Sequence, residues 1–173
     1  MASTPDHLTL KEHRDGQHRV ELVARRTLIG LLTLLCVLAL FNVFGQNPAH
    51  SIGTGEVATL EVSAPARLRG GLFYEGEFTI RARQEIESAT LLLDRGWFES
   101  MHINSYSPEP VGSAYRNGML ALDYGHVAEG DTLVARLQFQ VNATNLGHRS
   151  QSVQLHDEDV PLAAIERSVT IFP

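Results

Sequence analysis

The sequence is short of thiols and amines. Cys36 is the only cysteine and Lys11 the only lysine in the 173 residues. Cys36 lies inside a long apolar run, so residues 46–173 have no thiol for a disulfide or for a soft metal ion. A domain in that region has to be stabilised by its hydrophobic core, which a chain of roughly 100 residues or more can supply.

Positive charge is also scarce in most of the chain. The whole chain has a formal net charge of -6, and residues 1–45 carry +1, which leaves -7 on residues 46–173. Nucleic-acid phosphates are bound by basic surfaces. We therefore expect no nucleic-acid partner.

The sequence lacks the motifs of common catalytic and ligand-binding sites. It has no Gly-x-Ser-x-Gly elbow for a nucleophile. His102, His126, His148 and His156 do not have metal-ligand spacing, and the acidic run 156–159 lacks the pattern of a calcium loop. We predict a protein that is not an enzyme and has no cofactor and no metal site.

One segment predicts a membrane span. Residues 27–44 contain no charged side chain, and a helix of that length reaches roughly 27 Å, close to the ~30 Å of a hydrocarbon core. We predict a single-pass transmembrane helix over residues 27–45. A cleaved signal peptide is the alternative, but about 26 residues precede the run and the run exceeds the usual 7 to 15 residues. These features favour an uncleaved signal-anchor.

The flanking charges predict the orientation of this helix. Arg25 and Arg26 adjoin its start, and no Lys or Arg follows it before Arg67. The positive-inside rule places the N-terminus in the cytoplasm and the C-terminal domain in an extracytoplasmic position at the plasma membrane. The strong preference for arginine over lysine suggests a G+C-rich genome, and therefore a bacterial protein.

Three residues in the predicted span are candidates for contact with another helix. Gly30 and Thr33 share a helix face and would let a second helix approach closely. Asn42 could form a hydrogen bond across such an interface.

Two polar segments flank the span. Residues 1–26 have little apolar surface, so we expect a largely disordered cytoplasmic tail. Residues 46–56 are rich in Gly, Pro, Ser and Asn and show no periodicity, which predicts a flexible tether.

Residues 57–173 show the period-two alternation of β-strands. In residues 131–142 every second side chain is apolar (Leu133, Ala135, Leu137, Phe139 and Val141), and a similar pattern occurs in residues 76–83. Weaker alternations recur between turn signals such as Asn117-Gly118. Seven to nine short strands in about 117 residues are typical of a two-sheet sandwich.

At the level of this pattern, residues 57–173 resemble the immunoglobulin-like and fibronectin-type domains of single-pass bacterial envelope proteins. The resemblance rests on strand count and turn spacing, and the Cys-Trp-Cys arrangement of antibody domains is absent. The predicted fold class is mainly β: an N-terminal transmembrane helix followed by one extracytoplasmic immunoglobulin-like β-sandwich.

The segment 94–112 is the most distinctive part of this domain. It places four large side chains around turns: Trp97, Phe98, Met101 and Tyr106. Exposed aromatic residues are typical of contact patches, whereas buried ones would cap the core. We predict a non-enzymatic interaction module that docks on an envelope or membrane protein, in an oligomeric state that the sequence leaves open. A glycan- or lipid-binding module that uses aromatics near Trp97 is the alternative.

Overall fold

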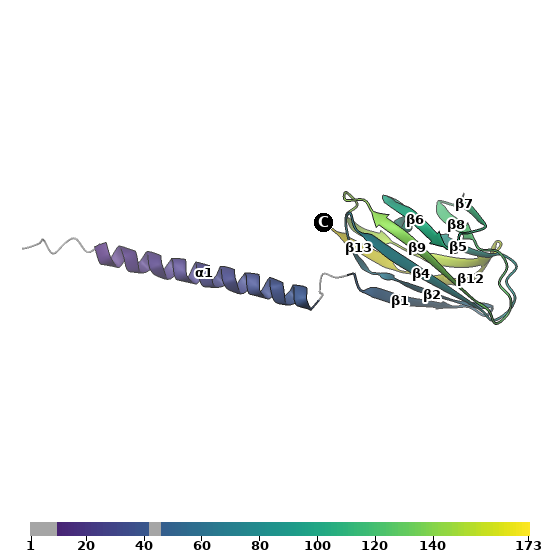
Figure 1. Ribbon diagram of the computed structural model, residues 1–173, viewed down its shortest axis with the longest axis horizontal. Helices are drawn as coiled ribbons and strands as arrows, with labels where there is room; N and C mark the ends of the chain where they lie inside the picture. Colours follow the sequence, from purple (N-terminus) through teal and green to yellow (C-terminus); the bar gives the residue numbers. More distant parts are fainter. Residues whose placement is uncertain (1–9, 42–45) are drawn as a thin grey trace, which may run out of the picture. The chain divides into compact units, whose positions relative to one another are not determined.

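The structure, a computed structural model, describes residues 10–41 and 46–173, with side chains from residue 20 onward. The chain divides into two units, residues 1–45 and residues 46–173. The first unit contains one helix and the second contains all the strands (Figure 1).

The helix α1 spans Leu10–Leu40 and begins well before the predicted span. The prediction of disorder for residues 1–26 was therefore wrong for residues 10–26, while residues 1–9 lie outside the described part of the chain. Leu10, Lys11 and Glu12 are good helix formers, and no proline interrupts the segment, so the helix extends through its polar part.

The apolar part of α1 is exposed along its length. Val20–Leu40 is long and apolar enough to cross a membrane, a property that a signal sequence near the N-terminus shares. Most of its large side chains are 40 to 85% exposed, from Val37 at 40% to Leu40 at 85%, and Leu38 is half-buried. An exposed apolar surface of this extent is typical of a segment that contacts a membrane or another protein.

The second unit is built from thirteen strands and one short 3-10 helix. These are β1(Pro48–Thr54), β2(Ala58–Pro65), β3(Arg67–Arg69), β4(Phe73–Ala82), β5(Ala89–Leu93), η1(Arg95–Trp97), β6(Met101–Ser107), β7(Gly112–Arg116), β8(Met119–Asp123), β9(Thr132–Val141), β10(Gly147–Ser150), β11(Val153–Asp157), β12(Val160–Ile165) and β13(Ser168–Phe172). Pro108 follows β6 through a cis peptide bond.

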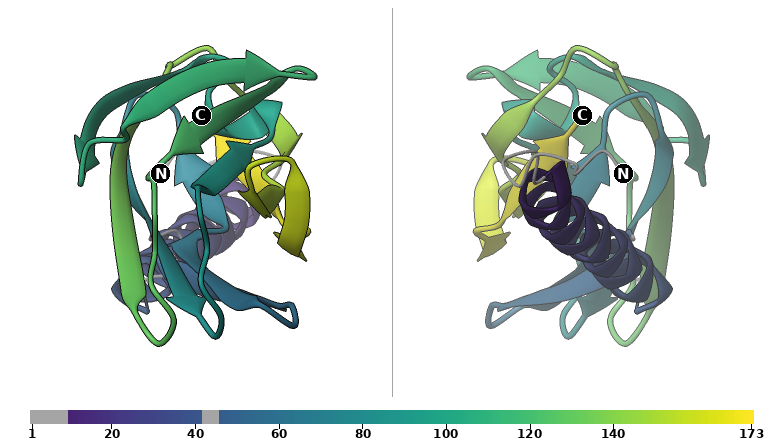
Figure 2. Two further views of the ribbon diagram at one scale, coloured as in Figure 1. Left: turned by 90° about the vertical axis from the view of Figure 1, so that its right-hand side faces the viewer. Right: turned by 90° about the vertical axis from the view of Figure 1, so that its left-hand side faces the viewer.

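The strands form two five-stranded sheets and a smaller third sheet. The orders are β1-β2-β4-β9-β6, β12-β11-β5-β8-β7 and β10-β13-β3. All pairs are antiparallel except β13 with β3. Viewed end-on, the sheets surround a common interior (Figure 2).

Alternate residues of the long strands fill that interior. On β9, Ala135, Leu137, Phe139 and Val141 are buried, and they pack with residues such as Phe78 of β4 in one hydrophobic core. The chain is thus mainly β, with an apolar N-terminal helix and a β-sandwich, which confirms the predicted fold class at this level.

The predicted tether is largely a strand. Within residues 46–56, β1 pairs along its whole length with β2, so the prediction of a flexible segment was wrong for Pro48–Thr54. Its glycines serve close packing: a Cβ on Gly53 would lie 2.5 Å from the Ala164 carbonyl oxygen, and one on Gly55 would lie 1.8 Å from that of Leu162. Glycine there lets β1 approach β12, and the same residues had suggested a loop.

Candidate interaction surface

The two long sides of the sandwich differ in how they are closed. On one side, the edge strands β1 and β12 lie next to each other, because Gly53 and Gly55 admit the β12 backbone. On the other side, β6 ends one sheet and β7 ends the other, and the two are not paired with each other. The β6–β7 side is therefore an opening between the two sheets, where no ladder joins their edge strands.

Strand β7 shows this opening most directly. Tyr115 lies opposite the buried Leu120 of β8, so its side chain faces the interior layer. It is nevertheless 71% exposed, and Val111, the residue before β7, is 80% exposed. An inward-facing residue with this exposure shows that the facing sheet does not cover β7.

Strand β6 turns two side chains toward the same opening. A register shift between Ile103 and Ser105 adds one residue, which lets Tyr106 share the inward face with Ile103. Both side chains are half-buried and pack against the core.

Four aromatic side chains gather between β6 and β7, and we call them the aromatic cluster: Phe98, Tyr106, Tyr115 and Tyr124. The Phe98 and Tyr115 rings meet edge to face, with 5.5 Å between their centroids. Burial raises the pKa of the Tyr106 hydroxyl, and proximity to Tyr115 raises it further. Burial, with a smaller contribution from Tyr106, raises the pKa of Tyr124. These phenols stay neutral at physiological pH, so the cluster is an uncharged, amphipathic surface.

The structure separates the four residues predicted as a patch. Phe98 and Tyr106 belong to the aromatic cluster, whereas Trp97 is fully buried and Met101 is only 6% exposed. Trp97 and Met101 therefore do not belong to an exposed patch, and for Trp97 the alternative of a buried residue of the core holds. Trp97 also cannot serve as the stacking platform of the alternative hypothesis, because its ring lies between Phe78 and Phe139.

Trp97 belongs to a buried polar network instead. Its Nε1–H donates to the Gln151 carbonyl oxygen at 3.0 Å, and Gln151 Nε2 donates to the Tyr74 hydroxyl at 3.1 Å. The Arg167 guanidinium lies 5.0 Å above the Trp97 ring and donates to the Ala64 carbonyl oxygen. Desolvation lowers the pKa of Arg167, and its charge is offset by the ring face and carbonyl oxygens.

A polar depression borders this network on the surface. It has a volume of about 530 Å³ and is lined by His148, Ser150, Ser152, Glu166, Arg167 and Ser168. The Ser150 hydroxyl already donates to Asp94 Oδ2 at 2.6 Å. Among the described residues, no three His, Cys, Asp or Glu side chains come together in a way that could hold a metal ion.

The candidate contact residues of the helix are only partly described. A Cβ on Gly30 would have no atom within 4 Å, so its face is open. The Thr33 hydroxyl donates to the Ile29 carbonyl oxygen at 2.8 Å and is satisfied within its own helix. Asn42 lies outside the described residues. A role for these residues in contact with another helix stays a prediction.

Sequence reasoning missed Tyr115 and Val111. Tyr115 sits in a short segment, residues 112–116, whose side chains alternate too weakly to indicate a buried face. The exposure of Tyr115 follows from the position of β7 at the edge of its sheet, where it pairs only with β8. The local sequence pattern of a strand does not show how many neighbours the strand has.

Comparison with known proteins gives no family. No family model and no curated protein matches the chain. Among solved structures, a CARDB domain from Pyrococcus furiosus, determined with di-metal ions, is 14% identical, with a TM-score of 0.44 over 68% of this chain and 91% of that one. A non-cellulosomal cohesin from Archaeoglobus fulgidus is 13% identical, with a TM-score of 0.40 over 73% of this chain and 92% of that one.

A third solved structure is similar to a comparable degree. The third cohesin ScaC of Acetivibrio cellulolyticus, solved in complex with the ScaB dockerin, is 9% identical, with a TM-score of 0.38 over 62% of this chain and 94% of that one. At these TM-scores the likenesses assign no function to this chain.

Proposed function

We propose that this protein is a membrane-anchored, non-enzymatic interaction module whose β6–β7 side docks on another protein of the cell envelope. The observation that carries the proposal is the open side of the sandwich. Two unpaired sheet edges and the aromatic cluster meet there, and the inward-facing Tyr115 is 71% exposed.

Free sheet edges and aromatic residues are both suited to protein recognition. An edge strand offers unpaired backbone donors and acceptors to which an extended segment can add. Tyrosine is enriched in interface hot spots because it combines a large apolar ring with a hydroxyl. Strand β7 provides both features, since all five of its residues are exposed.

The anchor is the second part of the proposal. The exposed apolar surface of Val20–Leu40 needs a covering, and a lipid bilayer matches its length and composition. Arg25 and Arg26 favour a cytoplasmic N-terminus. The sandwich would then lie outside the plasma membrane of a bacterium, where the lack of cysteines in residues 46–173 leaves it independent of disulfide formation.

In-vivo photo-crosslinking tests the docking side. A photoreactive amino acid is placed at Val111, at Tyr115 or, as a matched control, at Val160 on the β11–β12 hairpin, which is also an exposed valine at 62%. We expect one discrete adduct from Val111 and from Tyr115, and none from Val160. Blank lanes at Val111 and Tyr115 in a correctly inserted protein would remove the β6–β7 side as the docking surface.

A further inference from the structure

Three segments meet at one end of the sandwich, which we call the β3–β13 end: residues 66–73, 142–149 and 168–173. Phe172 of β13 lies opposite Arg69 of β3, and Gly147 lies opposite Ile171. The Leu72 carbonyl oxygen accepts from the Val141 amide at 3.0 Å, which joins the first segment to the end of β9.

The β3–β13 end is unusually apolar for a solvent-exposed surface. Leu72, Phe73, Leu146 and Phe172 are 45 to 54% exposed. They are half of the large exposed hydrophobic residues described in residues 46–173, the others being Ile52, Val111, Tyr115 and Val160. Concentration of such side chains at one end marks a contact surface.

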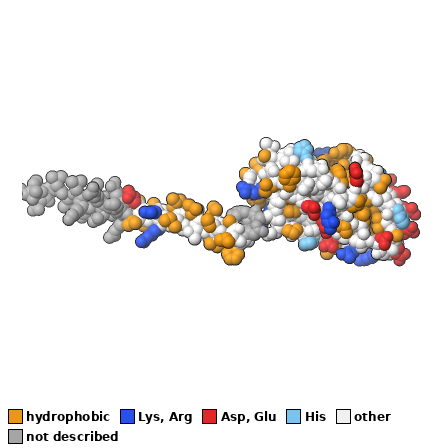
Figure 3. All heavy atoms as spheres, viewed as in Figure 1, with side chains coloured by type: hydrophobic (Ala, Val, Ile, Leu, Met, Phe, Trp, Pro, Cys, Tyr) orange, Lys and Arg blue, Asp and Glu red, His pale blue; other side chains and the backbone are white. Residues whose placement is uncertain are grey.

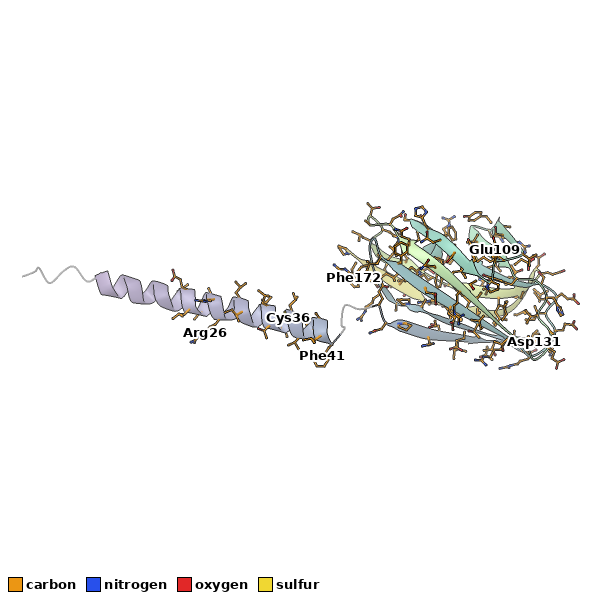
Figure 4. All side chains as sticks on the ribbon, in the orientation of Figure 1. Arg26, Cys36, Phe41, Glu109, Asp131 and Phe172 are labelled. Atoms are coloured by element: carbon orange, nitrogen blue, oxygen red, sulfur yellow. The ribbon has the colours of Figure 1, made fainter. Side chains whose placement is uncertain are left out.

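Charge is also distributed unevenly between the two ends. The three segments contain Arg67, Arg69 and Arg149 and no Asp or Glu. The loops at the opposite end contain Arg83 and the acidic residues Glu56, Glu85, Glu87, Glu109, Glu129, Asp131, Glu158 and Asp159. Acidic side chains gather at that end in Figure 3, and Figure 4 shows Phe172 and Asp131 at opposite ends of the sandwich.

The chain from the helix enters the sandwich at the β3–β13 end. Pro48 pairs with Pro65, the last residue of β2, which is two residues before β3 begins, and Gln46 lines a pocket with Tyr74 of β4. Phe41 and Gln46 are five residues apart in the sequence, so their Cα atoms are at most about 18 Å apart. An anchored helix would therefore hold this end of the sandwich within reach of the bilayer surface.

We propose that the β3–β13 end is a lipid-contacting surface that rests on an anionic headgroup layer. This inference depends on the membrane anchoring stated under the proposed function. Leucine and phenylalanine side chains insert at the boundary between headgroups and acyl chains, and arginines beside them attract anionic phosphates. The three segments themselves contain no Asp or Glu, and exposed Glu99 adjoins them at Asn145, so the arginines outnumber the acidic side chains there.

Depth-dependent quenching in liposomes tests the contact. The full chain carries Cys36→Ala and one new cysteine, Phe73→Cys or Leu146→Cys, labelled with a fluorophore; Val160→Cys is the control because it is exposed at the opposite end. In vesicles with an anionic phospholipid and a spin-labelled lipid, we expect the labels at 73 and 146 to be quenched at least about threefold more than the label at 160.

A charge reversal tests the role of arginine. Arg67→Glu should reduce quenching at position 73 in anionic vesicles by about twofold or more, whereas Arg81→Glu, the same change at an exposed residue of β4, should not. Equal effects of the two reversals would overturn the electrostatic part of the inference.

Alkaline extraction separates the two ways of failing. If the chain remains in the membrane but positions 73, 146 and 160 are quenched equally, the lipid-contacting surface is wrong and the anchored module stands. If alkaline buffer releases the chain, the anchoring itself is wrong.

Discussion

At the scale of single residues, burial decides the role of the aromatic side chains. Trp97 and Tyr115 are both large and amphipathic, yet Trp97 is fully buried and Tyr115 is 71% exposed. Trp97 satisfies its N–H within the core through Gln151. Tyr115 has water on most of its ring, so it is available to a partner.

The first prediction concerns Trp97, the only tryptophan in the chain. Its fluorescence should be blue-shifted and resistant to acrylamide, since the ring is fully buried. Trp97→Phe should lower the free energy of unfolding by about 2 kcal/mol through lost volume and the lost hydrogen bond to Gln151, as measured by urea denaturation followed by circular dichroism. The control Tyr115→Ala should change it by less than about 0.5 kcal/mol.

The second prediction concerns Tyr74 at alkaline pH. Burial raises the pKa of its hydroxyl, despite the opposing effects of the hydrogen bond from Gln151 and the charge of Arg167. The folded state therefore holds the proton more tightly than the unfolded state, and this stabilisation is complete below about pH 10 and is lost as pH rises above it.

Melting temperatures at pH 8 and pH 10.5 measure this effect. Tyr74→Phe should lower the melting temperature at pH 8, because the hydroxyl's contacts with Gln151 and Met101 are lost. Between pH 8 and pH 10.5, the melting temperature of Tyr74→Phe should also fall less than that of the wild type. Tyr115→Phe is the exposed control. If Tyr74→Phe lost as much melting temperature as the wild type between the two pH values, and Tyr115→Phe lost less, Tyr74 would not be the group that causes the alkaline loss.

At the scale of elements, two glycines determine which side of the sandwich closes. The β1 and β12 backbones come close only because Gly53 and Gly55 have no Cβ. On the other side, β6 and β7 each have one neighbour and leave the aromatic cluster accessible. The close approach of β1 to β12 thus depends on the two glycines at this edge of the sheet.

The third prediction tests this closure. Gly55→Ala should destabilise the sandwich by about 1 to 3 kcal/mol, because the new methyl group would lie 1.8 Å from the Leu162 carbonyl oxygen unless β1 shifts. Gly112→Ala is the matched control, since its Cβ would have no contact closer than 4.0 Å. Thermal unfolding of the two variants measures the difference, and equal melting temperatures would show that β1 does not need this glycine.

At the scale of the whole molecule, an apolar helix and a β-sandwich follow each other in one chain. The helix exposes its large apolar side chains, while the sandwich buries most of its own. The bilayer that we propose around the helix would account for this contrast, and the uneven charge of the sandwich is consistent with that proposal.

The fourth prediction tests the span. Leu34→Arg places a charge near the middle of Val20–Leu40 and should cost about 2.5 to 3.5 kcal/mol of insertion free energy. We expect part of this variant to become extractable by alkaline buffer, while Val20→Arg at the helix end should stay in the membrane like the wild type. Wild-type protein that migrates below 19.1 kDa would instead indicate a cleaved signal sequence.

The sequence determined the features that depend on local periodicity. The alternation in residues 131–142 predicted β9 and its buried face correctly, because side chains on a strand point to opposite sides in turn. The run of residues 27–44 predicted an apolar helix for a different reason, because it has no charged side chain and is nearly long enough to cross a hydrocarbon core. The glycines in residues 46–56 led to the wrong prediction of a flexible tether, because glycine is favoured both in loops and where two backbones approach closely.

The tertiary structure alone decided which surfaces are exposed. Strand order left β7 with one neighbour and brought β1 to β12, and these contacts join residues far apart in the sequence. The same packing buried Trp97, exposed Tyr115 and gathered Leu72, Leu146 and Phe172 at one end. Alternation specifies the face of a strand, whereas exposure depends on which other strand covers that face.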